Sequence, residues 1–145
     1  MTVKLVIGLD GAETGNRALA FAKDLGKKIG DCELIVAYVI EWSPFTFQTP
    51  EENAQRHKRR EEELKLATDR IVAPAVAALE AEGFAARGIV RHGDVADTLS
   101  KISTENGAGQ IIVGRTSESG FATRLFGSST SNLVMNADVP VTVVG

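Results

Sequence analysis

Glycines and serines near the end of the chain frame a loop whose composition suits phosphate binding. An apolar, β-branched run at residues 111–113 stops at Gly114, a polar segment follows, and Gly127 and Ser128 stand where a helical pattern begins. Phosphate oxygens reach backbone amides where no Cβ intervenes, and the first amides of a helix attract anions. A strand, a loop and a helix entrance in this order favour nucleotide binding. The alternative is conformational, with Gly114 ending a strand and Gly127 starting a helix.

A carboxylate stands just after the first apolar run. Residues 3–9 are largely apolar and lead into Asp10 and Gly11. At the end of a buried strand, the Asp10 carboxylate can bond a ribose hydroxyl or hold a metal bound to phosphate. It can equally cap the turn and the helix that follow. Position alone leaves both roles open.

The elements that must position these residues alternate along the chain. A carboxylate at Asp94 can cap one of the helices, and Pro74 is expected to kink another, because proline lacks a backbone donor and clashes with the preceding turn. Strands alternating with helices predict βαβ units, and so an α/β fold with a parallel sheet and helices on both faces. The expected strands are residues 3–9, 33–40, 85–90, 110–113 and 139–144, and the expected helices are residues 18–29, 51–83, 94–102 and 128–135.

The spacing of the glycines resembles the universal stress protein family. Its ATP-binding members carry Gly, two residues, Gly, nine residues, and then Gly followed by Ser or Thr. Here Gly114, Gly127 and Ser128 match, and Ser117 stands at the second glycine. Residues 6–11, 93–94 and 139–144 also have counterparts in the family, so the resemblance covers essentially the whole chain.

The resemblance implies a topology as well as a ligand. It implies a Rossmann-like, doubly wound sheet of five strands in the order 3-2-1-4-5, formed by residues 1–145 as a single domain. In such sheets ligands bind outside the carboxyl ends of the strands where the order reverses, here between the first and fourth strands. Asp10 and Gly114 are expected to meet there.

The implied ligand is ATP or another adenine nucleotide, with magnesium as the companion of the phosphates. Asp10 would contact the ribose or the metal, and no metal site formed by the protein alone is expected. The backbone of Val39 would read the adenine, beside Gly8, Leu9 and Val113, and each of these has ordinary core packing as its alternative. The phosphates would be held by Gly114, Ser117, Gly127, Ser128 and Ser129.

Ser117 is the departure from the family pattern. Its hydroxyl can donate to a phosphate oxygen, but at a positive φ it would impose strain of about 1 kcal/mol. Glu118 beside it adds negative charge, which Arg115 and Arg124 can offset. We therefore expect weaker ATP binding than in a complete motif, or a preference for a less charged nucleotide.

The composition of the chain argues against several other kinds of function. The formal net charge of −3, from 16 basic and 19 acidic residues, gives no basic field for binding nucleic acid. A single cysteine, Cys32, with only His57 and His92 beside it, cannot build a Cys/His zinc site and fits a reducing cytoplasm. We expect neither export nor a membrane span, because no segment approaches about 18 consecutive apolar residues.

Two other segments carry weaker signals. The mixed charges of residues 51–63 are typical of a solvated helix face. Trp42, Phe45 and Phe47 lie between two prolines, where they either form a lid or partner site or pack on the long helix. No nucleophile motif such as GxSxG occurs, so catalysis beyond slow ATP hydrolysis is not indicated.

The function implied by the resemblance is that of a cytoplasmic stress-response sensor, which binds ATP and alters its interactions with a protein partner. The alternative is a nucleotide-free dimerisation or adaptor module. In either case we expect a homodimer, because the apolar run of Val139, Val141, Val143 and Val144 lies at a sheet edge in the implied topology. The alternative is that these valines complete the core of the monomer.

Overall fold

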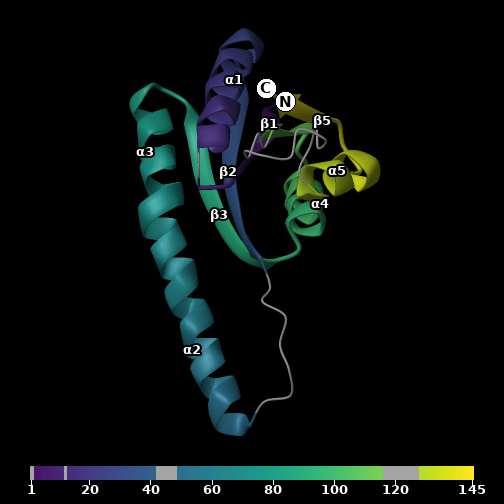
Figure 1. The fold of residues 1–145 in the computed structure, drawn as a ribbon. Helices are drawn as coiled ribbons and strands as arrows, with labels where there is room; N and C mark the ends of the chain where they lie inside the picture. The colour runs from purple at the N-terminus through teal and green to yellow at the C-terminus, as the bar shows by residue number, and fades with distance from the viewer. Residues whose placement is uncertain (1, 12, 42–48, 116–127) are drawn as a thin grey trace.

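The computed structural model describes residues 2–11, 13–41, 49–115 and 128–145. These residues form a sheet of five parallel strands in the order β3-β2-β1-β4-β5 (Figure 1). The predicted α/β class and strand order are therefore confirmed. The strands are β1 (Val3–Leu9), β2 (Cys32–Glu41), β3 (Ala85–Gly93), β4 (Gln110–Gly114) and β5 (Val141–Val144).

Helices cover both faces of the sheet. Successive side chains of a strand point to opposite faces, so strands buried on both sides are apolar throughout. Leu5 and Ile7 pack under α1 and α3, and Val6 packs under α4 and α5. Figure 1 shows these two pairs of helices on opposite sides of the sheet. The helices are α1 (Glu13–Ile29), α2 (Pro50–Ala67), α3 (Ala73–Ala81), α4 (Val95–Asn106) and α5 (Ser128–Asn136), with a π-helical turn η1 (Thr68–Val72).

The long helix contains a π-helical turn just before Pro74. The ring of a helical proline clashes with the carbonyl four residues earlier, which here belongs to Arg70 inside η1. The turn places Val72 directly over β3, where a Cβ on Gly88 would overlap the Val72 side chain. The helix can therefore cross the sheet closely only because residue 88 is glycine.

The starts of two helices follow from their capping residues. Asp94 accepts a hydrogen bond from the amide of Asp97 at 3.0 Å, which confirms the predicted cap of α4. Thr49 and Glu52 form a reciprocal capping box at the start of α2. Most side chains of the charged run at residues 51–63 are exposed, as predicted for a solvated face. The aromatic residues of the preceding segment lie outside the described residues.

Two strand boundaries differ from prediction by two residues or more. β3 continues past residue 90 to Gly93, because its polar residues are paired: Arg91 with Glu105 at 2.7 Å, and His92 with Glu63 at 3.1 Å. β5 begins at Val141, two residues later than expected. Within the described parts of the chain, none of the helices combines the length and the apolarity needed to cross a membrane.

Candidate functional site

The strand order reverses between β1 and β4, and their carboxyl ends lie side by side. Gly8, near the end of β1, pairs with Val113, near the end of β4. β1 connects through α1 to β2 on its other side, so the strand order changes direction between β1 and β4. Crevices at such points are where open α/β sheets bind ligands.

Three predicted residues, Gly8, Val39 and Val113, come together on the face of the sheet covered by α4. Val39 and Val113 are buried in one apolar cluster with Leu99. A Cβ on Gly8 would lie 3.0 Å from Cγ1 of Val113 and 3.0 Å from Cδ1 of Leu99. The two valine side chains are thus core residues, and only their backbone groups stand at the edge of the sheet.

The backbone of Val39 stands at a step in the sheet. β1 ends at Leu9, which pairs with Tyr38, whereas β2 continues to Glu41 beside β3 alone. Val39 is therefore the first residue of β2 beyond the end of β1. Leu9, which follows Gly8, packs on the opposite face of the sheet with α1. Leu9 and Val39 therefore lie at the same carboxyl edge of the sheet, but their side chains do not line a common pocket.

Asp10 makes the capping contact that was one of its two predicted roles. Its Oδ1 atom accepts a hydrogen bond from the amide of Gly15 at 3.1 Å, in the first turn of α1. A Cβ on Gly15 would lie 3.2 Å from Oδ1, so a small residue allows this approach. The positive end of the helix dipole favours a carboxylate here. The contact holds the Asp10 carboxyl group at the carboxyl edge of the sheet.

The end of β4 is joined to two other elements. Gly114 pairs with Val144, and the amide of Arg115 donates to the carbonyl of Val144 at 2.7 Å. Nη2 of Arg17, from α1, donates to the carbonyl of Arg115 at 3.1 Å. Sequence reasoning missed Arg17, because its partner is 98 residues away and no local pattern marks it.

The structure describes only part of the predicted phosphate loop. Ser117 and Gly127 lie outside the described residues. Ser128 and Ser129 are the first two residues of α5, the helix start that the sequence predicts, and the first turn of α5 has no acidic residue. The free amides of such a turn suit an anion.

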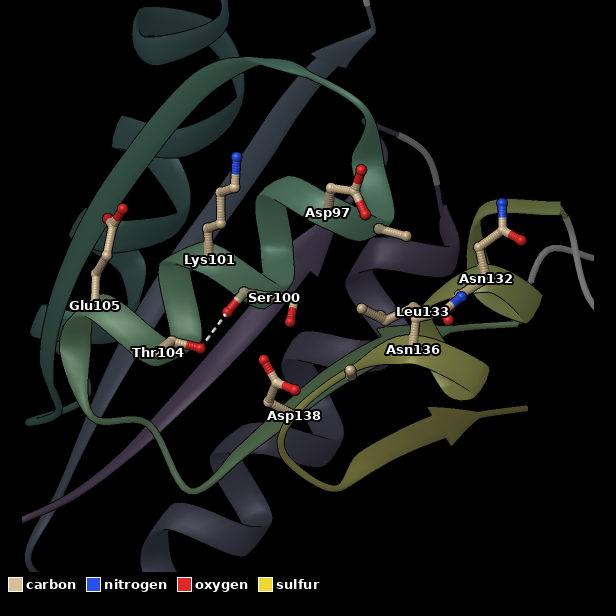
Figure 2. Close-up of a pocket in the computed structure, with 11 residues that line it drawn as sticks. Asp97, Ser100, Lys101, Thr104, Glu105, Asn132, Leu133, Asn136 and Asp138 are labelled. Carbon is tan, nitrogen blue, oxygen red and sulfur yellow. Dashed lines mark hydrogen bonds between the residues drawn. The ribbon is translucent and has the colours of Figure 1, made fainter.

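Two hollows lie on opposite faces of the sheet. One, of about 560 Å³, lies between α1 and the η1–α3 helix and includes Leu9 and Gly11. The other, of about 400 Å³, lies between α4 and α5, contains none of the predicted nucleotide-binding residues, and presents carboxylates, hydroxyls and amides (Figure 2). Its labelled residues are Asp97, Ser100, Lys101, Thr104, Glu105, Asn132, Leu133, Asn136 and Asp138. In the described residues, no group of three or more His, Cys, Asp or Glu side chains is arranged to hold a metal ion.

Comparison with known proteins places these features in context. A model of the Universal stress protein family matches residues 1–145. The fold is similar to that of the hypothetical protein MJ0577, at 26% identity and a TM-score of 0.78, covering 99% of this chain and 96% of that one. Among curated proteins, none matches the chain.

Two further solved structures are similar in fold and hold nucleotides. One is a universal stress protein in complex with cAMP, with 22% identity and a TM-score of 0.63, covering 99% of this chain and 96% of the other. The second is the universal stress protein from Archaeoglobus fulgidus in complex with dAMP, with 17% identity and a TM-score of 0.61, covering 99% and 98%.

Proposed function

Because this chain belongs to the universal stress protein family, we propose that it binds an adenine nucleotide across the carboxyl ends of β1 and β4. The observation that carries the proposal is the pairing of Gly8 with Val113 where the strand order reverses. The cAMP and dAMP complexes of proteins with this fold support an adenine nucleotide as the ligand class.

The phosphates would occupy the segment between β4 and α5. Gly114 ends β4, and Ser128 and Ser129 open α5 without an acidic neighbour in its first turn. Backbone amides at such a helix start bind anions. Ser117 and Gly127, which lie outside the described residues, complete the proposed phosphate site on the strength of the sequence pattern.

The nucleoside would lie toward β2. Asp10, fixed by its hydrogen bond from Gly15, would accept from a ribose hydroxyl or take part in holding magnesium. The step beyond Leu9 leaves the backbone of Val39 beside the end of β1, where it would contact the adenine. Gly8 and Val113 would form the floor of the site through their backbone.

The proposed role is regulatory. We place the protein in the cytoplasm as a stress-response sensor, in which ATP or a less charged adenine nucleotide alters the interactions with a protein partner. The hydrogen bond from Gly15 commits Asp10 to capping α1, so we assign it a binding role rather than that of a general base, and any ATP hydrolysis would be slow.

The edge strand β5 supports the proposed homodimer. The carbonyls of Pro140 and Val144 accept from Ile111 at 2.9 Å and Arg115 at 2.7 Å, so both face β4. The N–H and C=O groups of successive residues in a strand point to opposite edges, so the backbone groups of residues 141 and 143 face away from β4. A second β5, antiparallel across a twofold axis, would pair with these groups.

The proposal is tested on the purified native protein. We expect adenine nucleotide to be released on denaturation, or calorimetry to show binding of ATP or AMP to nucleotide-free protein. If neither nucleotide is released or bound, nucleotide binding is excluded and the adaptor function is favoured instead.

A further inference from the structure

Arg17 holds its guanidinium group at the point where the chain leaves β4. The residue lies in the second turn of α1, and Nη2 donates to the carbonyl of Arg115, the residue that follows β4. The side chain is half-buried, and its Nε atom is buried without a hydrogen-bond acceptor among the described residues. Nη2 therefore has a protein acceptor among the described residues, and Nε has none.

Arg17 also has no ion pair with any side chain that the structure describes. Two other arginines are paired with carboxylates: Arg87 with Glu33 at 3.1 Å, and Arg91 with Glu105 at 2.7 Å. Among the side chains that the structure describes, no carboxylate oxygen lies within 4.0 Å of the Arg17 guanidinium. A partly desolvated cation without a counter-charge is unfavourable unless an anion binds it.

The neighbouring arginine does not take this position. The Arg115 side chain extends over the end of β5, where its Cζ and Nη2 atoms lie 3.9 Å from the position of a Cβ on Gly145. The Arg17 guanidinium lies instead on the main chain of Arg115, beside α1. Asp10, bonded to Gly15 in the same helix, holds the first turn of α1 at this edge.

We propose that Arg17 binds a phosphate group of the nucleotide, with Nη2 kept on the Arg115 carbonyl and the other donors of the guanidinium turned to phosphate oxygens. A planar guanidinium can serve both partners at once because its five N–H groups point in fixed directions. This inference rests on the proposed nucleotide binding at the same edge. It assigns the phosphate contact to α1, which covers the opposite face of the sheet from α5.

The test compares ATP with adenosine in calorimetric titrations of native protein and Arg17→Gln. We expect Arg17→Gln to weaken ATP binding at least about tenfold and to leave adenosine binding unchanged, because adenosine has no phosphate. The control, Arg91→Gln, removes the same charge from an arginine that is paired with Glu105, and ATP binding should stay as in the native protein. Thermal unfolding of each variant establishes that it is folded.

The outcomes separate the two proposals. Native protein that binds neither ATP nor adenosine overturns nucleotide binding and this inference with it. If native protein binds ATP and Arg17→Gln binds it equally well, only the role of Arg17 is overturned. An equal loss for ATP and adenosine also overturns the phosphate contact, since it is the result expected if Arg17 only positions Arg115.

A second measurement covers the case in which Arg17→Gln does not fold. In the native protein, the Nε–H resonance of Arg17, assigned by its absence from Arg17→Lys, should shift on addition of ATP and stay in place on addition of adenosine. If the protein binds ATP and the Nε–H resonance of Arg17 does not shift, the inference is overturned.

Discussion

Gly8 and Val113 are paired across β1 and β4, and a side chain on Gly8 would press on the side chains of Val113 and Leu99. A Cβ at residue 8 would lie 3.0 Å from Cγ1 of Val113 and 3.0 Å from Cδ1 of Leu99, both in the buried core. The glycine therefore lets α4 and β4 approach the end of β1, beneath the proposed nucleotide.

Gly8→Val should destabilise the fold by about 1–3 kcal/mol, the usual cost of overpacking a core. Urea unfolding measures the change. Gly109→Ala is the control, because a Cβ there would meet only the Lys4 carbonyl, at 3.9 Å, and stability should change little. A Gly8→Val variant as stable as native protein would show that the core rearranges freely at this point.

Asp10→Ala should cost both stability and nucleotide affinity. Loss of the hydrogen bond from Gly15 removes about 1 kcal/mol of stability, as for other helix caps. Asp94→Ala removes the corresponding bond from Asp97 at the start of α4 and should cost a similar amount. Only Asp10→Ala should weaken ATP binding, by at least about tenfold. Native affinity in Asp10→Ala would restrict Asp10 to its capping role.

Cys32 should react slowly with alkylating reagents. Burial raises the pKa of its thiol, and the negative charges of Asp31 and Glu33 raise it further. A raised pKa leaves less thiolate at neutral pH, so the rate with iodoacetamide should be below that of a model thiol and should rise only at more alkaline pH. Rapid reaction of the folded protein near pH 7 would contradict this environment. Unfolding in urea should restore the ordinary rate.

Val143→Pro should convert the proposed dimer to a monomer. Proline at 143 removes a backbone donor that faces away from β4, so the ladder between β4 and β5 keeps its hydrogen bonds. Val143→Ala is the matched control, since it loses side-chain atoms but keeps the donor, and it should remain dimeric. Sedimentation velocity distinguishes the two. A native monomer, or a folded and dimeric Val143→Pro, would exclude the β5 interface.

The sequence pattern predicted those element boundaries that depend on residues nearby in the chain. The bounds of β1 follow from an apolar run that ends before Asp10, and the start of α4 follows from the cap at Asp94. Strand order came from the family resemblance, because periodicity alone does not say which parallel strands are adjacent. The carboxyl end of β3 escaped prediction, since Arg91 and His92 look like loop residues until their partners on helices are known.

The same limit applies to the site. The expectation that Asp10 and Gly114 meet depended on the strand order that the family resemblance implies, together with their places at the ends of the first and fourth strands. The contact of Arg17 with Arg115 could not be predicted, because it joins α1 to the end of β4 through a side chain that the helical pattern treats as ordinary surface. Of the π-helical turn, the sequence predicted only a kink at Pro74. The packing of Val72 on Gly88 could not be predicted, because it depends on where the helix crosses β3.

Backbone amide NMR of the protein titrated with ATP tests the central claim most directly. Nucleotide binding at the carboxyl edge predicts the largest shifts at Gly8, Leu9, Val39, Gly114 and Ser128, with little change around Asp138 in the hollow between α4 and α5. An unchanged spectrum, or shifts confined to the α4–α5 hollow, would contradict it.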